Sequence, residues 1–368
     1  MADVKKRILI ASVLKPVNDT RMTGKIAQSL ADTKQFDIHV TGFPAAQKNT
    51  PGFTVHPLPF FKRLSLQRLF IPWKIFRKAI LIKPHLLIIT THELLLIAMF
   101  TRVATGCKVI YDLQENYFRN ILFTKAFPFF IRPVIAFYVR MKELLCAPFV
   151  SHFFLAEKAY AKELSFSAAR STVLENKLKR PNISPSSRPD KNQLLFSGTL
   201  AESTGVFKAI EIAEKLHRAD QNISLTIIGY CAQQALLERI KKVIAPHSFI
   251  RLIGGNILVP HEQILEQIQV SGAGIIAYPY NPSTVHSVPT KLFEYLGFKL
   301  PIILIHHTPW VERCQSFHAA VVFDPDNLKP EAILRALKTQ QFYDTAPNDV
   351  FWESEEPKLT KLISSLLA

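Results

Sequence analysis

The sequence predicts an α/β protein built from two doubly wound domains, each with a mainly parallel sheet. Short β-branched or apolar runs alternate with helical patterns along the chain, which is typical of βαβ units. The length of 368 residues gives two domains at roughly 150 residues each. A stretch with three prolines and three serines, 176–192, separates two such series and is predicted to be a linker. Because doubly wound sheets bind ligands at the carboxyl ends of their strands, we expect the domains to face each other across a ligand cleft.

The first domain is predicted to span residues 1–175. Helical patterns lie between most of its strands, most clearly at 20–33 and 93–104. Runs with the length and composition of buried strands occur at 7–13, 36–43, 53–56, 86–90, 108–112 and 152–155. This alternation predicts a parallel sheet with helical connections.

The second domain is predicted to span residues 193–345 and repeats the pattern. The remaining segment, 346–368, ends in an apolar-striped helix that we expect to pack back onto the first domain. Strands are expected at 193–197, 224–229, 250–253, 274–277, 302–305 and 320–323, and helices at 205–218, 233–243, 262–269 and 290–297.

The composition excludes several classes of protein. Lysine and arginine total 45 and aspartate and glutamate 29, which gives a net charge of +16, yet 48% of the residues are hydrophobic. A disordered chain would combine high charge with low hydrophobicity, so a folded protein is expected. The four cysteines lie far apart without a C-x-x-C spacing, which favours a reducing cytoplasm over a disulfide framework or a zinc site. His306 and His307 lack a third ligand, so no metal is expected.

Two segments of the first domain, 61–83 and 117–142, combine basic with aromatic and aliphatic residues and contain no acidic residue. Such basic amphipathic segments lie on anionic membrane surfaces, although a packed helix with a solvated basic face has the same composition. No apolar run is long enough to span a bilayer. We therefore expect a cytoplasmic protein, peripheral on the inner face of the plasma membrane. The sequence has no helix-turn-helix, zinc-finger or RNP-type motif, so nucleic acid is not an expected partner.

The segment 286–304 carries the strongest indication of chemistry. Pro289 suits a first helical turn, where its missing N–H group costs no hydrogen bond, so a helix is expected to begin there. The free N–H groups and the positive end of the helix dipole then favour an anionic ligand, with Lys291 alongside. Glu294 lies one turn further on, where its carboxylate can accept both hydroxyl groups of a ribose. The alternative is an ordinary amphipathic helix with Lys291 and Glu294 in solvent.

Residues 289–303 read P-T-K-L-F-E-Y-L-x(3)-L-P-I-I. This phrase resembles the nucleotide-sugar signature P-x-K-x-x-E-x-M-A-x-G-x-P-V of the retaining GT-B glycosyltransferases, specifically glycosyltransferase family four (glycosyl transferases group 1). The resemblance implies a GT-B fold, with two Rossmann-like domains facing each other across a cleft, and transfer of a hexosyl group from a nucleotide sugar. Further phrases resemble family segments in the same order along nearly the whole chain, at 18–31, 83–93, 109–117, 194–213, 224–230 and 249–280.

The resemblance implies roles for individual residues. It places Glu294 on the ribose of the donor and Lys291 near its diphosphate, with Gly198 and Thr199 in the loop that faces the phosphates. His92 is expected beside the transferred sugar, with a strand-end histidine satisfied by its neighbours as the alternative. Since retaining transfer in this family lets the donor phosphate accept the acceptor's proton, the protein is expected to stabilise the departing diphosphate.

Four residues near strand ends of the first domain are candidates for the acceptor side: Lys15, Asp19, Glu115 and Asn116. Polarity of an ordinary surface loop is the alternative for Glu115 and Asn116.

The sequence departs from the family pattern where the phosphates are expected. The first of the family's paired glutamates corresponds to His286, and the loop that reads G-R-L-x-x-x-K-G in the family reads G-T-L-A-E-S-T-G here. The glycine pair common in the first-strand loop is replaced by residues 14–17. Loss of the loop's arginine and lysine removes charge that would stabilise a leaving diphosphate. Lys208, His286 and Lys15 are candidate replacements, so His286 joins His92 as a candidate catalytic residue.

The sequence therefore predicts an enzyme that moves a sugar, with retention, from a nucleoside diphosphate donor to a glycan or lipid-linked acceptor, in cell-surface polysaccharide biosynthesis. No cofactor or metal is expected, because protein dipoles and cations replace the ion. One alternative is a catalytically degenerate protein of this fold that binds a glycan, a nucleotide or a partner enzyme without turnover. A nucleotide-sugar epimerase is a second alternative.

Overall fold

The computed structural model describes residues 5–45, 52–62, 65–124, 127–181 and 189–368 and divides into two compact α/β units. Unit 1 consists of Met1–Lys179 and Trp352–Ala368, and unit 2 of Arg180–Phe351.

Unit 1 contains a seven-stranded parallel sheet in the order β3-β2-β1-β4-β5-β6-β7. All of these strands were predicted except the short β7, and β1 runs further than predicted because Pro16 resumes pairing with Phe43 of β2. The strands are β1 (Lys6–Pro16), β2 (Phe36–Phe43), β3 (Thr54–Pro57), β4 (Leu86–Ile89), β5 (Lys108–Leu113), β6 (His152–Leu155) and β7 (Ser171–Val173).

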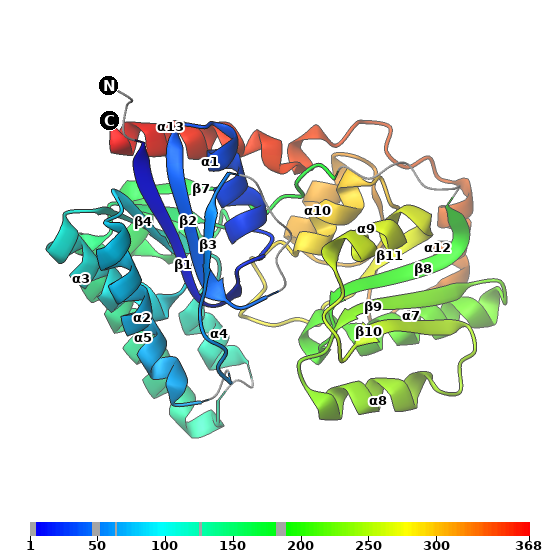
Figure 1. Ribbon diagram of the computed structural model, residues 1–368. Coiled ribbons are helices and arrows are strands. Elements are labelled where there is room, and N and C mark those ends of the chain that lie inside the picture. The colour runs from blue at the N-terminus through cyan, green and yellow to red at the C-terminus, as the bar shows by residue number, and fades with distance from the viewer. Residues whose placement is uncertain (1–4, 46–51, 63–64, 125–126, 182–188) are drawn as a thin grey trace. The chain divides into compact units, whose positions relative to one another are not determined.

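Helices cover both faces of this sheet, which explains why its strands are continuous apolar runs (Figure 1). On one face, α2 (Gln67–Ile82), α3 (Leu95–Thr105) and α5 (Arg132–Cys146) pack against alternate strand residues. On the other face, α1 (Gln28–Asp32) and α13 (Glu356–Leu367) pack against the intervening ones. Shorter helical turns complete the unit: η2 (His92–Leu94), η4 (Ala147–Phe149), α6 (Tyr160–Glu163), η5 (Ser165–Arg170) and η8 (Trp352–Ser354).

Three helical segments of unit 1 differ from the prediction. The predicted helix 20–33 starts as a π-helix, η1 (Met22–Ala27), before α1. The basic segment 61–83 is helical only from Gln67. The segment 117–142 is interrupted: α4 (Tyr117–Phe123) is followed by a 3₁₀ turn, η3 (Phe129–Ile131), and then α5, because the prolines around that turn lack N–H donors for a continuous helix. Residues 63–64 and 125–126 of these segments lie outside the described residues.

The C-terminal segment belongs to unit 1. The Trp352 side chain is completely buried, its indole N–H donates to Ser29 Oγ over 2.8 Å, and its backbone N–H donates to the Leu178 carbonyl over 2.7 Å. Lys177 Nζ lies 2.7 Å from Glu355 Oε1, and both side chains are almost fully buried. The predicted linker therefore starts too early, because Lys177 is held in the interior of unit 1 by a buried partner.

Unit 2 contains a six-stranded parallel sheet in the order β10-β9-β8-β11-β12-β13. The predicted linker 176–192 also ends too late, because Asp190 already pairs with Ser271 of β11. The strands are β8 (Asp190–Thr199), β9 (Ser224–Tyr230), β10 (Ile250–Gly255), β11 (Ser271–Ile276), β12 (Ile302–Ile305) and β13 (Ala320–Phe323).

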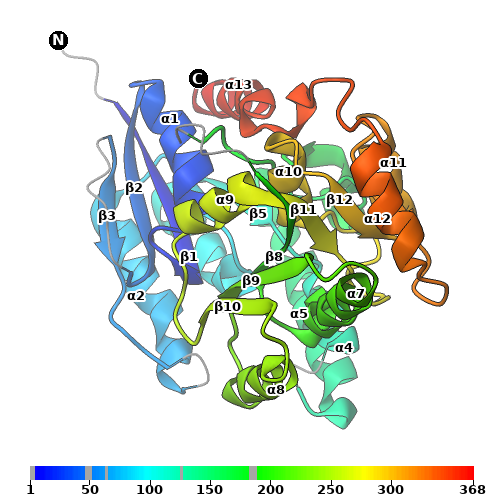
Figure 2. The same cartoon turned by 90° about the vertical axis from the view of Figure 1, so that its right-hand side faces the viewer.

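The four helices predicted for unit 2 agree with the structure to within one residue at each end. Figure 2 shows α7 (Val206–Ala219) and α8 (Gln234–Ile244) on one side of strands β8 to β10, and α9 (His261–Val270) and α10 (Thr290–Gly297) on the other. The unit also contains α11 (Thr308–Gln315), α12 (Pro330–Thr339) and the turns η6 (Glu202–Thr204) and η7 (Asn348–Val350).

Candidate functional site

The residues assigned to the donor lie on two strand-to-helix connections of unit 2. Gly198 and Thr199 end β8, while Lys291 and Glu294 lie in the first turns of α10, which follows the neighbouring strand β11. Pro289 is the N-cap residue of α10 rather than its first helical residue, and the helix runs over the predicted range, from Thr290 to Gly297. Both connections leave the carboxyl ends of parallel strands, the edge at which such sheets bind ligands.

Two glycines shape this edge. A Cβ on Gly229, at the end of β9, would lie 1.7 Å from the Gly198 carbonyl oxygen, so only glycine allows the two strand ends to approach this closely. Gly198 itself has φ of +97°, and a Cβ there would lie 3.8 Å from Lys291 Cε. The side of the β8 end that faces Lys291 therefore carries no side chain.

The side chain of Lys291 is buried without an anionic partner in the described part of the chain. It is 4% exposed, and Nζ has no hydrogen-bond partner among the residues that the structure describes. Nζ lies 4.0 Å from the ring centroid of Phe196 and 5.2 Å from that of Tyr278. Burial lowers the pKa of Lys291 to about 7, and the nearby Glu294 only partly opposes this shift. An anion reaching Nζ would supply the missing hydrogen bonds and favour the charged form.

Glu294 has a partner that the sequence did not reveal. His261, the first residue of α9, places Nε2 2.8 Å from Glu294 Oε1. The Glu294 side chain is 13% exposed, so the histidine fixes a carboxylate that still has accessible surface. Because His261 and Glu294 lie on separate helices, only the fold brings them together, and no sequence pattern singles out His261.

The remaining unit 2 candidates are less well placed to replace the missing loop charges. Lys208 Nζ donates to Glu211 Oε2 over 2.9 Å, so its charge is already partly neutralised. His286 is exposed in the loop before α10. The Thr199 carbonyl accepts a hydrogen bond from the Thr204 hydroxyl over 2.7 Å, which orders the loop that follows β8.

His92 lies in unit 1, in the turn η2 that follows β4. Its Nδ1 is 2.9 Å from Lys142 Nζ, and the ring meets Tyr117 edge-on with centroids 4.6 Å apart. Because an ammonium donates, Nδ1 accepts, and the ring proton resides on Nε2. Burial, reinforced by the charges of Lys142 and Arg68, lowers the pKa of His92 to about 4 despite the opposing charge of Glu93. His92 is therefore neutral near pH 7 and can donate a hydrogen bond through Nε2.

The four acceptor-side candidates make local contacts. Lys15 lies in the last residues of β1, Asp19 follows that strand, and Glu115 and Asn116 follow β5. Lys15 Nζ is 4.0 Å from Asp19, whose carboxylate also accepts the backbone N–H groups of Arg21 and Met22 over 3.0 and 2.7 Å. Their role toward an acceptor stays a prediction.

Glu115 and Asn116 differ in exposure. Asn116 is 4% exposed and caps α4: its Oδ1 accepts the Arg119 backbone N–H, and its Nδ2 donates to Glu163 over 2.9 Å. Glu115 is exposed and accepts a hydrogen bond from Asn120 over 2.8 Å.

His306 and His307 directly follow β12. Across the described part of the chain, no three histidine, cysteine or acidic side chains gather in an arrangement suited to a metal ion. The His307 ring instead stacks on Trp310 with centroids 3.7 Å apart.

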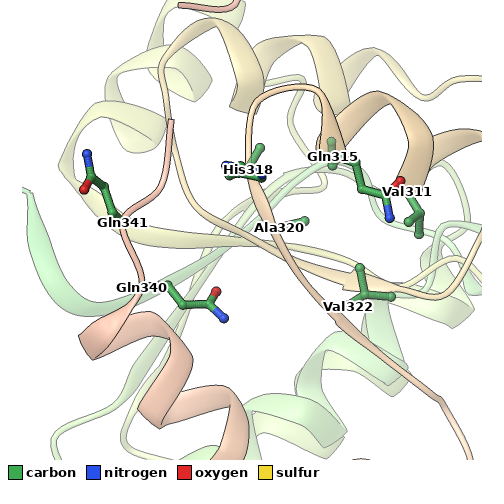
Figure 3. A pocket seen from close by; sticks show the side chains of 9 residues that line it. Val311, Gln315, His318, Ala320, Val322, Gln340 and Gln341 are labelled. Carbon is green, nitrogen blue, oxygen red and sulfur yellow. The ribbon is translucent and has the colours of Figure 1, made fainter. Parts of the chain in front are cut away.

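A pocket of about 360 Å³ lies beside β13, the edge strand of unit 2's sheet, and none of the donor candidates lines it (Figure 3). His318 and the glutamines Gln315, Gln340 and Gln341 line it together with small apolar residues of α11 and β13. None of its lining residues is an acid, lysine or arginine, so it lacks a charged group to recognise a phosphate.

No family model and no curated protein matches this chain. Solved structures do match. Sucrose-phosphate synthase from Thermosynechococcus elongatus gives a TM-score of 0.71 at 12% identity, covering 98% of this chain and 99% of that one. HepE from Anabaena, solved with UDP and glucose, gives 0.66 at 13% identity over 98% and 100% of the two chains. The catalytic domain of starch synthase IV from Arabidopsis thaliana, solved with ADP and acarbose, gives 0.66 at 10% identity over 99% of each.

At these identities the likeness is one of fold. Together with the two parallel sheets, it confirms the predicted fold class, a GT-B protein with two doubly wound Rossmann-like units. Whether the units face each other across a cleft stays a prediction.

Proposed function

We propose that the chain is a retaining hexosyltransferase of glycosyltransferase family four that moves a sugar from a nucleoside diphosphate donor to a glycan or lipid-linked acceptor. The proposed setting is cell-surface polysaccharide biosynthesis at the inner face of the plasma membrane. The observation that carries the proposal is the buried ammonium of Lys291 in the first turn of α10, which lies beside Gly198 and has no hydrogen-bond partner among the described residues. The Lys291 side chain supplies a cation for a diphosphate, and the first turn of α10 supplies free backbone N–H groups.

The chemistry requires little more than charge stabilisation. The bond between the anomeric carbon and the donor phosphate breaks, and the acceptor oxygen forms a bond to the same face of that carbon. The acceptor's proton passes to the departing phosphate oxygen. Lys291 and the N–H groups of α10 hold the charge that develops on the diphosphate, while Glu294, held by His261, accepts the ribose hydroxyls. We propose that no metal or other cofactor takes part. His92 donates through Nε2 to a hydroxyl of the sugar.

The solved relatives support a nucleotide donor. HepE was solved with UDP and glucose, and starch synthase IV with ADP and acarbose. A nucleoside diphosphate is the ligand class that fits an unpartnered ammonium and a ribose-accepting carboxylate one turn apart.

Calorimetric titration with UDP, GDP and their common sugar conjugates tests the donor site. One nucleotide is expected to bind, and Glu294→Ala is expected to lower its affinity at least tenfold, because a carboxylate that accepts two hydroxyl hydrogen bonds is lost. Glu238→Ala, an exposed acid on α8, is the matched control and should leave the affinity unchanged. If the folded protein binds no nucleotide, the proposed donor site is wrong.

A second candidate function is a protein of this fold that binds a glycan, nucleotide or partner enzyme without turnover. The loop 198–205, which lacks arginine and lysine, and the pairing of Lys208 with Glu211 favour it. Nucleotide binding without release of free sugar or transfer product from the bound nucleotide sugar, across an acceptor screen, would support this candidate over the enzyme.

Donor affinity is expected to depend on pH through Lys291. Because the pKa of Lys291 in the free protein is lowered to about 7, the side chain is mostly neutral at pH 8 to 9 and must take up a proton to bind a diphosphate. Above pH 7 the affinity should therefore fall toward tenfold per pH unit. Calorimetry at pH 8 in buffers of different ionisation enthalpy should show uptake of nearly one proton. Affinity independent of pH between 7 and 9 would contradict this expectation.

A further inference from the structure

Helix α5 in unit 1 exposes apolar side chains along one face, while its buried face combines Ala136, Val139 and Cys146 with two charged residues. Val134, Phe137, Tyr138 and Leu145 share one helical face and are 59% to 70% exposed. On the buried face, Lys142 and Glu143 are 9% and 2% exposed. A helix that ends at an aqueous surface places such residues the other way round, so the exposed face of α5 is suited to an apolar environment.

The neighbouring helices extend this apolar surface. On α2, Phe70 and Trp73 are 65% and 53% exposed, and on α3 Phe100 and Val103 are 44% and 73% exposed. The Trp73 and Phe100 rings stack with centroids 6.3 Å apart, which joins the two helices at their exposed sides. Because α3 also contacts α5, the exposed apolar side chains of α2, α3 and α5 belong to one layer of helices (Figure 1).

The turn η3 adds a protruding aromatic pair. Phe129 and Phe130, which directly precede α5, are 82% and 78% exposed, more than any other phenylalanine in the described part of the chain. We call the exposed apolar side chains of α2, α3, η3 and α5 the aromatic face. So many large exposed apolar side chains on neighbouring elements mark an interaction site rather than ordinary surface.

The charges around the aromatic face have one sign. Lys74 and Arg77 are exposed on α2, and neither α2 nor α3 contains an acidic residue. The acid of α5, Glu143, is buried and lies 3.1 Å from Arg140, while Glu93 in the turn η2, just before α3, pairs with Arg68. The partner must therefore accept large apolar side chains and carry negative charge.

We propose that the aromatic face of unit 1 binds an anionic lipid bilayer. Phe129, Phe130 and the exposed aromatic residues of α5 enter the boundary between headgroups and acyl chains, while Lys74 and Arg77 contact lipid phosphates. In the described part of the chain no helix is long and apolar enough to cross a membrane, so the face lies on the bilayer. A second copy of the chain is a poorer occupant, because a symmetric contact would bring the basic residues of α2 against each other.

The bilayer surface bears on the acceptor, and this consequence rests on the proposed function. Helix α4 begins directly after the predicted acceptor-side residues Glu115 and Asn116 and leads into η3. The Tyr117 ring at its start contacts His92. The acceptor is then a lipid-linked molecule whose lipid remains in the bilayer while its headgroup reaches the carboxyl ends of β4 and β5.

Vesicle co-sedimentation of the full chain tests the bilayer proposal without any nucleotide or acceptor. We expect binding to phosphatidylcholine vesicles that contain phosphatidylglycerol, weaker binding to phosphatidylcholine alone, and weakening by salt. Phe129→Ser with Phe130→Ser should reduce partition about tenfold or more. Lys74→Gln with Arg77→Gln should reduce it by a similar factor at low salt. The matched control is Ile257→Ser with Leu258→Ser in unit 2, where the two side chains are 69% and 66% exposed, and it should bind as the wild type does.

Trp73 provides an independent readout. Of the three tryptophans, Trp310 and Trp352 are 2% and 0% exposed, so a change in emission on adding vesicles reports on Trp73. Its emission should shift to shorter wavelength and become protected from acrylamide with anionic vesicles.

Several outcomes would overturn the proposal. Failure of the wild type to bind anionic vesicles would do so, as would equal binding by the Phe129→Ser, Phe130→Ser variant with an unchanged unfolding midpoint. A wild-type dimer that this variant converts to a monomer, with no difference in vesicle binding, would assign the aromatic face to self-association instead. None of these results depends on donor binding, so failure here is distinguishable from failure of the proposed function.

Discussion

Asp112→Ala is expected to lower the free energy of unfolding of unit 1 by about 3–5 kcal/mol. Asp112 is completely buried, and its partner Arg21 is 2% exposed. Arg21 Nε and Nη2 donate to the carboxylate over 3.0 and 2.7 Å, and Nη1 donates to the Leu174 carbonyl over 2.8 Å. Without the carboxylate, a guanidinium remains in the interior with one carbonyl partner, and the desolvation of its charge is no longer offset.

Urea unfolding in a Trp310→Phe background measures this effect, because Trp73 and Trp352 then report on unit 1 alone. The matched control is Glu211→Ala, which removes a carboxylate paired with Lys208 and Lys215 on the surface of α7. There the loss should stay within about 1 kcal/mol, since exposed pairs are screened by water. A loss as small as the control's for Asp112→Ala would show that the buried pair contributes little to the stability of unit 1.

Lys291→Met is expected to lower affinity for a nucleoside diphosphate by a factor of about 30 to 1,000, the effect of removing one partner of a buried, charge-assisted contact worth roughly 2–4 kcal/mol. The same substitution should leave the free energy of unfolding unchanged or raise it. The ammonium is buried without a hydrogen-bond partner among the described residues, so an apolar side chain of similar length avoids its desolvation.

Calorimetry and thermal unfolding of the same variant measure both effects. Lys241→Met, which removes an exposed lysine of α8 that pairs with Glu238, is the control and should bind the nucleotide as the wild type does. If the Lys291→Met protein bound the nucleotide as the wild type does, the ammonium of Lys291 would have no part in donor binding. A variant that loses stability along with binding would indicate a structural role for Lys291.

Much of the architecture was predictable because parallel strands buried on both faces appear as continuous apolar runs. The predicted bounds of α10 are those observed, since Pro289 and the apolar periodicity mark both ends. The short β7 was missed because Ser171–Val173 offers too few residues for a pattern. The linker was misplaced because Lys177, a charged residue in a proline-containing stretch, is buried against Glu355 and Ser354, which lie far along the sequence.

The site was predictable only where its residues lie close in sequence. Lys291 and Glu294 were found from their spacing on one helix, whereas His261 and Lys142 contact Glu294 and His92 from other helices and were not singled out. Asn116 shows a different limit: it stands before the apolar turn of α4 as an N-cap residue does, and that pattern could have identified its capping role.

For the basic segments 61–83 and 117–142, the composition could be read from the sequence, but the orientation of their side chains could not. Their lack of acids and their apolar content were evident from the sequence, but a helical pattern does not say which face is covered. Only the fold shows that Lys142 lies inside and Phe137 outside.

The return of the C-terminal segment to unit 1 has a consequence for the order in which the chain matures. Unit 2 is continuous in sequence, so a growing polypeptide holds all of its strands once residue 351 has emerged. Unit 1 begins before unit 2 and is completed after it. Lys177 has no Glu355 to pair with, and the site that Trp352 fills stays empty, until residues 352–368 are made. A premature stop codon just after residue 351 would therefore destabilise unit 1, although most of unit 1 precedes that codon.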